Sequence, residues 1–145
     1  MTDRLDFYST NPPAIKAMIA LEEYIRRSGL EHSLAELVRL RASQINGCAY
    51  CIDMHVADAR KEGETERRLA TLSAWRETRF FTDQERAALA WTESVTLVSQ
   101  DHVPDSVWQE VHPHFTPEEL VDLTLLIVTI NGWNRLAIAF RKLPD

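Results

Sequence analysis

The stretch of sequence that decides both the fold and the chemistry is Asn46–His55, which reads Asn-Gly-Cys-Ala-Tyr-Cys-Ile-Asp-Met-His. It contains both cysteines of the chain, Cys48 and Cys51, and a histidine follows the second cysteine by four residues. The Asn-Gly pair favours a break between two helices, so the second helix opens at Cys48. On a helix, steps of three and four residues turn about 300° and about 400°. Cys48, Cys51 and His55 are therefore expected on one helix face.

Two thiols with an imidazole beside them suit thiol–disulfide chemistry. One thiolate attacks, the second resolves, and the imidazole moves the proton. The free N–H groups and the dipole at a helix start stabilise a thiolate, which favours Cys48 as the more acidic thiol. A peroxide attacked by one thiolate gives a sulfenic acid, and the second cysteine condenses with it to a disulfide. The motif predicts a thiol-dependent redox enzyme.

The rest of the chain predicts an all-α protein, a single helical domain of about seven helices over residues 1–145. Prolines follow Asn11, and Ser33, Thr82 and Thr116 each precede a glutamate by three residues, as in a capping box. No alternating segment is flanked by hairpin turns, which excludes the thioredoxin fold, another fold that uses this cysteine spacing. The expected helices cover residues 11–27, 33–46, 48–63, 65–75, 82–98, 104–112 and 116–140.

The last of these helices is apolar on nearly every side from Leu120 to Ile130. Such a helix is expected to be buried centrally or against another subunit. It also carries polar residues, Asn131, Asn134 and Arg135, which are expected either to satisfy buried carbonyl groups or to pair with acids across a subunit boundary.

Composition argues against several classes of partner and location. The 16 basic and 22 acidic residues leave a net charge of −6, which disfavours binding to nucleic acid or to an anionic membrane. The first residues carry mixed charge and no apolar run, unlike a signal peptide. The apolar stretch at 120–130 is shorter than the ~20 residues of a membrane span. We expect a soluble cytoplasmic protein, in which a close cysteine pair is catalytic or metal-binding rather than a structural crosslink.

Glu36 is a further candidate, 12 residues before Cys48 on the preceding helix. If the Asn-Gly break folds the two helices into a corner, this carboxylate is expected to face the Cys48 thiol and share protons with it. A purely local role is the alternative, since Glu36 occupies the third position of the possible Ser33 capping box.

Together, Glu36, the Cys48-Ala-Tyr-Cys51 segment and His55 resemble the motif of the alkylhydroperoxidase D core within the carboxymuconolactone decarboxylase superfamily. The segments 40–48 and 131–136 are also similar to that family, and the resemblance covers roughly Leu34 to Phe140. It implies an all-helical homo-oligomer, often a trimer or hexamer. It also implies reduction of organic hydroperoxides with electrons from a dithiol or lipoyl-type donor.

By position, the resemblance implies that Cys51 attacks the peroxide, Cys48 resolves, and Glu36 and His55 relay protons. This order differs from the helix-start argument, which favours Cys48 as the more acidic thiol. No bound metal or organic cofactor is implied, because sulfur carries the electrons. The decarboxylase branch lacks the cysteine pair, so its lactone chemistry is not implied.

Two alternatives remain at this point. The two cysteines and His55 are good zinc ligands, and Glu36 would supply a fourth. The chain would then be a non-catalytic helical oligomer that holds zinc or senses redox state. The cysteines are otherwise small buried apolar residues without chemistry.

Overall fold

The computed structural model describes all residues from Met1 to Asp145 and contains helices and no strand. The all-α prediction is confirmed. The structure adds two four-residue helices and a three-residue 3-10 helix to the expected set, and it divides the segment at 65–75 into an α-helix and a 3-10 helix. The elements are α1 (Phe7–Thr10), α2 (Pro12–Arg27), α3 (His32–Asn46), α4 (Ala49–Lys61), α5 (Glu66–Thr71), η1 (Leu72–Glu77), α6 (Asp83–Thr96), α7 (Val98–Asp101), α8 (Asp105–Val111), η2 (His112–His114) and α9 (Pro117–Phe140).

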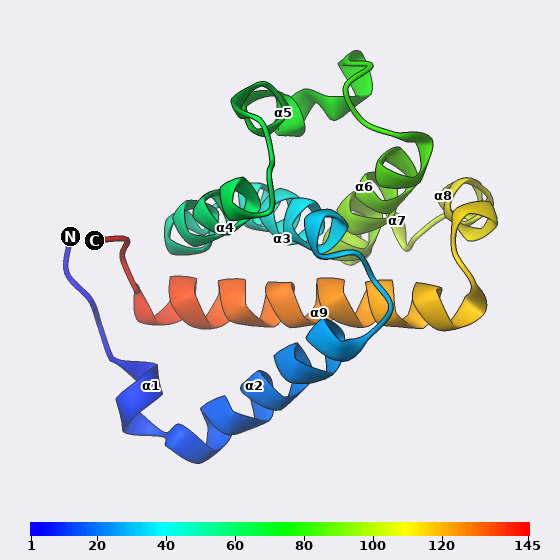
Figure 1. Cartoon of the computed structure of the whole chain (residues 1–145). Coiled ribbons are helices and arrows are strands. Elements are labelled where there is room, and N and C mark those ends of the chain that lie inside the picture. The colour runs from blue at the N-terminus through cyan, green and yellow to red at the C-terminus, as the bar shows by residue number, and fades with distance from the viewer.

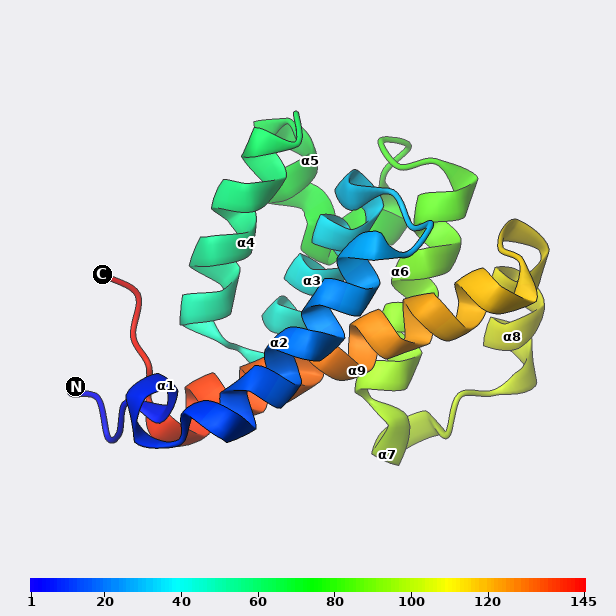
Figure 2. The ribbon, with the colours of Figure 1, turned by 60° about the horizontal axis from the view of Figure 1, so that its bottom comes forward.

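The long helix α9 is the axis of the molecule (Figure 1). Helix α2 crosses it on one side, and α3, α4 and α6 pack on the other, an arrangement that the turned view of Figure 2 also shows. By length and composition alone α9 could cross a membrane. Its inward residues Leu123, Leu126, Ile127 and Ile130 are fully buried between these neighbours. Helix α9 is therefore the core helix of a helical fold, as the apolar pattern predicts.

Helix α3 lies between two apolar clusters and contributes to both. Leu34 and Val38 pack with residues of α2, α6 and α9 in the larger cluster. Leu37 and Leu40, on another face of the same helix, pack with residues of α4, α5, η1 and α6 in the second. Burial on two faces fixes the position of α3, because each buried leucine contributes roughly 1.5–3 kcal/mol of transfer free energy.

Most helix starts follow their sequence signals. Thr116 forms a complete capping box with Glu119, and the Thr82 hydroxyl accepts a hydrogen bond from the backbone N–H of Glu85. The predicted capping box at Ser33 is wrong. Helix α3 begins at His32 with Glu31 as its N-cap residue, and the Glu36 side chain, which would complete the box, bonds elsewhere.

The two ends of the chain lie side by side (Figure 1). The backbone N–H of Arg4 donates to the carbonyl oxygen of Phe140 at 3.0 Å, and its guanidinium donates to the carbonyl oxygen of Ala139 at 3.1 Å. The Phe7 ring is buried against the Phe140 ring, with centroids 5.9 Å apart. These contacts hold α1 against the last turn of α9.

Candidate active site

A tight corner between α3 and α4 builds the site. Gly47 ends α3 in the left-handed region, with φ of 68°, which glycine adopts without the Cβ clash of other residues. Cys48 follows as the N-cap residue of α4, and Cys51 lies in the first turn of that helix. The predicted break at Asn46-Gly47 is therefore confirmed, and it turns the chain so that α4 packs along α3.

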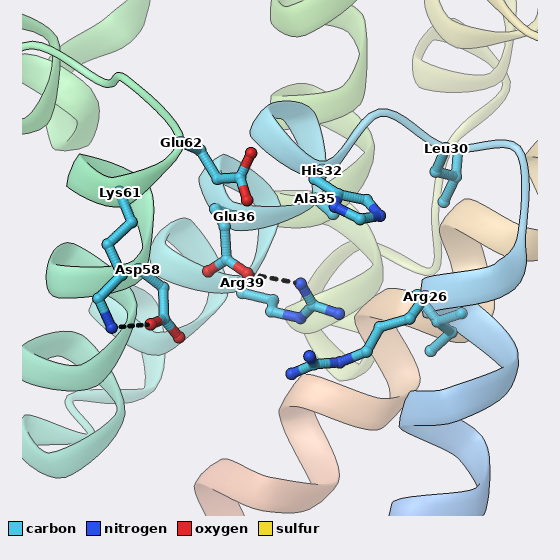
Figure 3. A pocket seen from close by; sticks show the side chains of 10 residues that line it. Arg26, Leu30, His32, Ala35, Glu36, Arg39, Asp58, Lys61 and Glu62 are labelled. Atoms are coloured by element: carbon cyan, nitrogen blue, oxygen red, sulfur yellow. Dashed lines mark hydrogen bonds and ion pairs between the residues drawn. The ribbon is translucent and has the colours of Figure 1, made fainter.

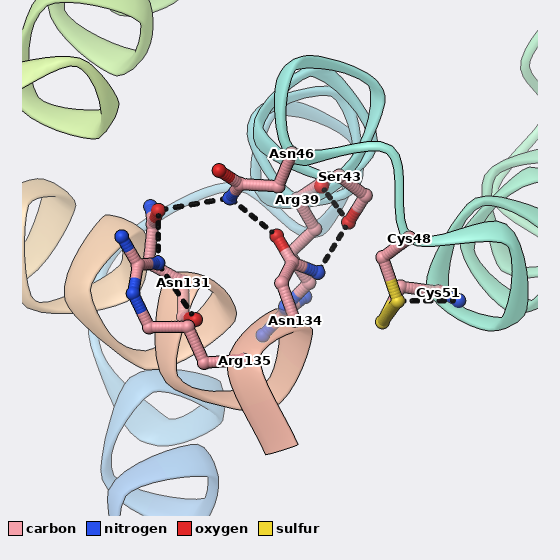
Figure 4. The surroundings of a disulfide bond; sticks show 8 residues. All are labelled: Arg39, Ser43, Asn46, Cys48, Cys51, Asn131, Asn134 and Arg135. Atoms are coloured by element: carbon pink, nitrogen blue, oxygen red, sulfur yellow. Dashed lines mark hydrogen bonds between the residues drawn. A yellow bond between two sulfur atoms is a disulfide. The ribbon is translucent and has the colours of Figure 1, made fainter. Parts of the chain in front are cut away.

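Cys48 and Cys51 are joined by a disulfide, with their Cα atoms 5.3 Å apart (Figure 4). Both are buried, with 2% and 1% of their surfaces exposed. The backbone N–H of Cys51 donates to the Cys48 sulfur at 3.3 Å. The sulfur of Cys48 thus takes the place of the oxygen that usually caps a helix start. A negative charge on Cys48 would be stabilised by this N–H group and by the helix dipole.

His55 and Glu36 meet across the corner. The Nδ1 atom of His55 lies 2.9 Å from Oε2 of Glu36, and both side chains are mostly buried. An ionised carboxylate only accepts hydrogen bonds, so Nδ1 carries the proton and Nε2 is left as the basic nitrogen. The expectation that Glu36 faces the Cys48 thiol is wrong, because its two oxygens bind His55 and Arg39.

Arg39 extends this pair into a buried network that links the four helices α2, α3, α4 and α9. Its guanidinium donates to Oε1 of Glu36 at 2.7 Å and to Oε2 of Glu22, on α2, at 3.0 Å. The indole N–H of Trp133, on α9, donates to the other oxygen of Glu22 at 3.0 Å. Each carboxylate is therefore held at both oxygens, and the whole set fixes the direction in which His55 points.

The charge state of Glu36 follows from these contacts. Burial pushes its pKa upward, but the hydrogen bond from His55 and the charge of Arg39 outweigh burial and hold the pKa below its ordinary value. Glu36 is accordingly a fixed anion at neutral pH. It orients His55 and stabilises a proton on that ring, as the carboxylate of a catalytic triad does for its histidine.

A cavity of about 200 Å³ opens onto this arrangement. Cys51, His55, Glu36 and Arg39 line it, whereas Cys48 does not. Its remaining lining comes mainly from apolar and aromatic side chains: Phe7, Tyr8, Ile19, Tyr50, Met54, Trp133 and Ala137. Cys51 and His55 are therefore lining residues of one cavity.

Polar residues of α9 anchor the corner (Figure 4). The Asn46 amide donates to the side-chain oxygens of Asn131 and Asn134, both at 2.9 Å. Asn134, which is fully buried, donates in turn to the Ser43 hydroxyl at 3.0 Å. Arg135 binds Asn131 of its own helix. These residues therefore tie the end of α3, just before Cys48, to the core helix within one chain.

A second cavity, of about 190 Å³, lies on another side of Glu36 and Arg39 and is polar (Figure 3). Among its lining residues, Asp58 pairs with Lys61. The possible ligand atoms of Glu36, His55 and Asp58 lie within 4.8 Å of one another. The positive charge of Arg39, which donates a hydrogen bond to Glu36, disfavours the binding of a metal cation by these three residues. In the disulfide state, the cysteines offer no thiolate for the zinc site considered from the sequence.

Four residues of the site were not identified from the sequence, and only one of them, Arg39, has a signal in the sequence. Arg39 lies one helical turn after Glu36, a spacing typical of an ion pair, and this signal was available. Glu22, Trp133 and Tyr8 come from distant parts of the chain and carry no local signal. Only the packing of α1, α2 and α9 around the corner brings them to the site.

Residues 12–94 match the family model described as the carboxymuconolactone decarboxylase family. The chain belongs to the carboxymuconolactone decarboxylase family. Within its relatives, the uncharacterized protein YdfG of Bacillus subtilis is 45% identical over 139 residues, which are 96% of this chain and 95% of that protein. The uncharacterized protein YnjA of Escherichia coli is 31% identical over 121 residues, 83% of this chain and 63% of its own length.

Several solved structures have the same fold as this chain. ATU0492 of Agrobacterium tumefaciens is of unknown function, with a suggested role as the antioxidant defence protein AhpD. It superposes with a TM-score of 0.96 at 43% identity, covering 99% of both chains. The debrominase Bmp8 superposes with a TM-score of 0.84 at 20% identity, covering 94% of this chain and 74% of its own. The alkylhydroperoxidase D-like fold expected from the sequence is thus confirmed. At 20% identity, the similarity to Bmp8 shows a shared fold only.

Proposed function

We propose that the protein is a thiol-dependent peroxidase of the alkylhydroperoxidase D type, which reduces hydroperoxides through a Cys48/Cys51 dithiol–disulfide cycle. The single observation that carries the proposal is the composition of the 200 Å³ cavity. Its lining includes one cysteine of the pair, Cys51, together with His55 and Glu36. An oxidant that enters the cavity then contacts both the nucleophile, Cys51, and a base, His55, whose orientation Glu36 fixes.

The oxidising half of the cycle assigns a role to each of these groups. Nε2 of His55 takes the proton of the Cys51 thiol, and Glu36 stabilises the imidazolium. The Cys51 thiolate attacks the terminal oxygen of the hydroperoxide, the O–O bond breaks, and the departing alkoxide takes the proton to leave as the alcohol. Cys51 is now a sulfenic acid. The Cys48 sulfur attacks it, water leaves, and the disulfide forms.

The reducing half of the cycle uses the same difference between the two cysteines: Cys51 lines the cavity and Cys48 does not. A dithiol donor of the lipoyl type attacks the Cys51 sulfur, and Cys48 departs as a thiolate. The N–H group of Cys51, 3.3 Å from that sulfur, stabilises the departing charge. The second thiol of the donor then attacks the mixed disulfide, which releases oxidised donor and the Cys51 thiolate. The helix start thus favours a thiolate on Cys48 as leaving group, while Cys51 remains the attacking residue.

We also propose a cytoplasmic location and a homo-oligomeric assembly, a trimer or hexamer. Support for assembly comes from an apolar groove of about 630 Å³ beside α9, whose lining includes Trp108, Phe115, Val121 and Val128. Val121 and Val128 are 67% and 52% exposed, an unusual state for valines on a core helix. Sedimentation of the purified protein tests this point, and a monomeric mass would contradict it.

Turnover with defined donors and oxidants tests the activity. The reduced protein is mixed with hydrogen peroxide, tert-butyl hydroperoxide or cumene hydroperoxide, with dihydrolipoamide as donor. Because one structural neighbour is a debrominase, 2,3,4-tribromopyrrole, a compound solved in complex with a variant of that neighbour, joins the panel. Hydroperoxide turnover that Cys51→Ser abolishes is expected. Zinc in the purified protein without turnover would instead favour the non-catalytic metal-binding alternative.

A further inference from the structure

The N-terminal segment supplies one wall of the cavity. Phe7 and Tyr8, both on the four-residue helix α1, are among the lining residues. This helix precedes the region at 12–94 that the family model matches. The wall therefore belongs to a part of the chain that the family motif does not define, although the motif residues lie on the same cavity.

The cavity has apolar side chains at its mouth and reactive ones at its floor. Tyr8, Ile19 and Met54 line its mouth and are 39%, 42% and 38% exposed, and the charged side chains of Arg26 and Asp58 lie beside them in the lining. Cys51 and His55, at 1% and 7%, form its floor. Tyr8, Ile19 and Met54 offer an apolar group a contact surface at the mouth, on the side of the cavity away from any bond-making atom of the substrate.

The wall is braced on several sides and is not a loose end. The Tyr8 ring stacks on the Trp133 ring, with centroids 6.2 Å apart and planes inclined by 23°. The Lys142 ammonium, from the C-terminal end, lies 5.9 Å from the Tyr8 ring and 5.0 Å from the Tyr50 ring. The buried Phe7 ring packs on Tyr8, with centroids 4.6 Å apart. An aromatic surface held in this way keeps its shape when a substrate binds.

We infer that the α1 wall, with Tyr8 at its centre, is the specificity-determining surface that binds the organic half of the substrate. It selects hydroperoxides whose carbon group is compact and apolar, of the size of tert-butyl or cumyl. The inference rests on the proposed peroxidase function. The size limit follows from the volume: about 200 Å³ is less than the roughly 300–1,000 Å³ of pockets that hold drug-sized ligands. A long-chain lipid hydroperoxide is too large while the wall is in place.

Substitution at Tyr8 tests the inference through ratios of kcat/KM. Hydrogen peroxide, cumene hydroperoxide and linoleic acid hydroperoxide serve as substrates. The wild-type protein is expected to prefer cumene hydroperoxide. Tyr8→Ala is expected to lower kcat/KM for cumene hydroperoxide about threefold to tenfold, the worth of an aromatic contact, with hydrogen peroxide unchanged. Turnover of the long-chain substrate should rise in the same variant, because the mouth widens.

Two further variants separate the wall from general effects. Tyr8→Phe keeps the ring and should keep the wild-type ratios. Tyr24→Ala makes the same truncation at an exposed tyrosine that does not line the cavity, and it should change none of them. A Tyr8→Ala protein with the wild-type ratio of cumene hydroperoxide to hydrogen peroxide would overturn the inference. So would a wild-type protein that reduces linoleic acid hydroperoxide as well as cumene hydroperoxide.

A binding measurement keeps the wall testable without turnover. If the wild-type protein reduces no hydroperoxide, the proposed function fails, yet the cavity still has its wall. Calorimetric titration of the disulfide form with cumyl alcohol, the product of cumene hydroperoxide, then reports on the wall alone. Binding that weakens about threefold to tenfold in Tyr8→Ala supports the inference. No binding to the wild-type protein, or equal binding to both proteins, contradicts it.

Discussion

Replacement of Arg39 by methionine is the sharpest probe of the buried network. Methionine keeps most of the apolar stem but removes the guanidinium that joins Glu36 to Glu22. The side chains of Arg39, Glu36 and Glu22 are only 6%, 12% and 17% exposed, so water cannot readily replace the lost partner. Two carboxylates that share one cation in the wild-type protein then face each other without it.

The magnitude follows from burial. Removal of one partner from a buried ion pair costs about 3–5 kcal/mol of unfolding free energy, because the other charge is left buried and uncompensated. In a domain of this size such a loss lowers Tm by roughly 10–20 °C. The deficit should shrink as the pH falls toward 5, because Glu36 no longer has the charge of Arg39 to offset the effect of burial on its pKa, and its protonation relieves the repulsion.

Thermal unfolding followed by circular dichroism at pH 7 and pH 5 is the assay. Arg60→Met is the matched control, since Arg60 pairs with Glu66 at the surface, where the two side chains are 53% and 72% exposed. That pair is solvated, and its loss should leave Tm unchanged within error. The reasoning is refuted if Arg39→Met melts at the same temperature as Arg60→Met, or if its deficit grows on acidification.

Two further predictions concern Glu36 and the anchor of the corner. Glu36→Gln should lower kcat by about 10²–10⁴-fold, because His55 loses the anion that stabilises its proton; stopped-flow turnover measures this. The folded-state pKa of Glu36 is lowered, so its contribution to stability is full above the ordinary carboxyl pKa of about 4.3 and is lost as the pH falls through the lower folded value. Urea unfolding of the wild type and Glu36→Gln across that range should show their difference shrinking only at the acid end. Asn134→Ala should cost about 1–3 kcal/mol in the same assay, because it removes a hydrogen-bond partner from the buried Ser43 and from the half-buried Asn46. An Asn134→Ala protein as stable as the wild type would contradict the anchoring role.

The fold was predictable because its signals are local. Prolines after Asn11 and the Thr116 capping box mark two helix starts correctly, and the all-round apolar pattern of the last helix predicts its central place. The error at Ser33 has a tertiary cause. Glu36 looks like a capping residue in sequence, but His55 and Arg39 bind its carboxylate, and the helix starts at His32 without it.

The site was predictable in part for a related reason. Helix periodicity brings Cys51 and His55 to one cavity, and the Asn-Gly break predicts the corner that brings Glu36 to His55. Contacts that depend on the packing of distant helices could not be predicted from the sequence. The sequence does not reveal that α2 carries Glu22 to the network or that α1 closes the cavity, because neither contact leaves a pattern in the nearby residues.

One measurement tests most directly the claim that Cys51 is the sulfur that meets the oxidant. Reduced Cys48→Ser and Cys51→Ser proteins each receive one equivalent of cumene hydroperoxide in the presence of dimedone, which traps sulfenic acid, and peptide mass spectrometry locates the label. Rapid labelling of Cys51 in the first protein, with little or none at Cys48 in the second, is the predicted result. Labelling at Cys48 that is as fast as that at Cys51, or no labelling of either protein, would contradict the account.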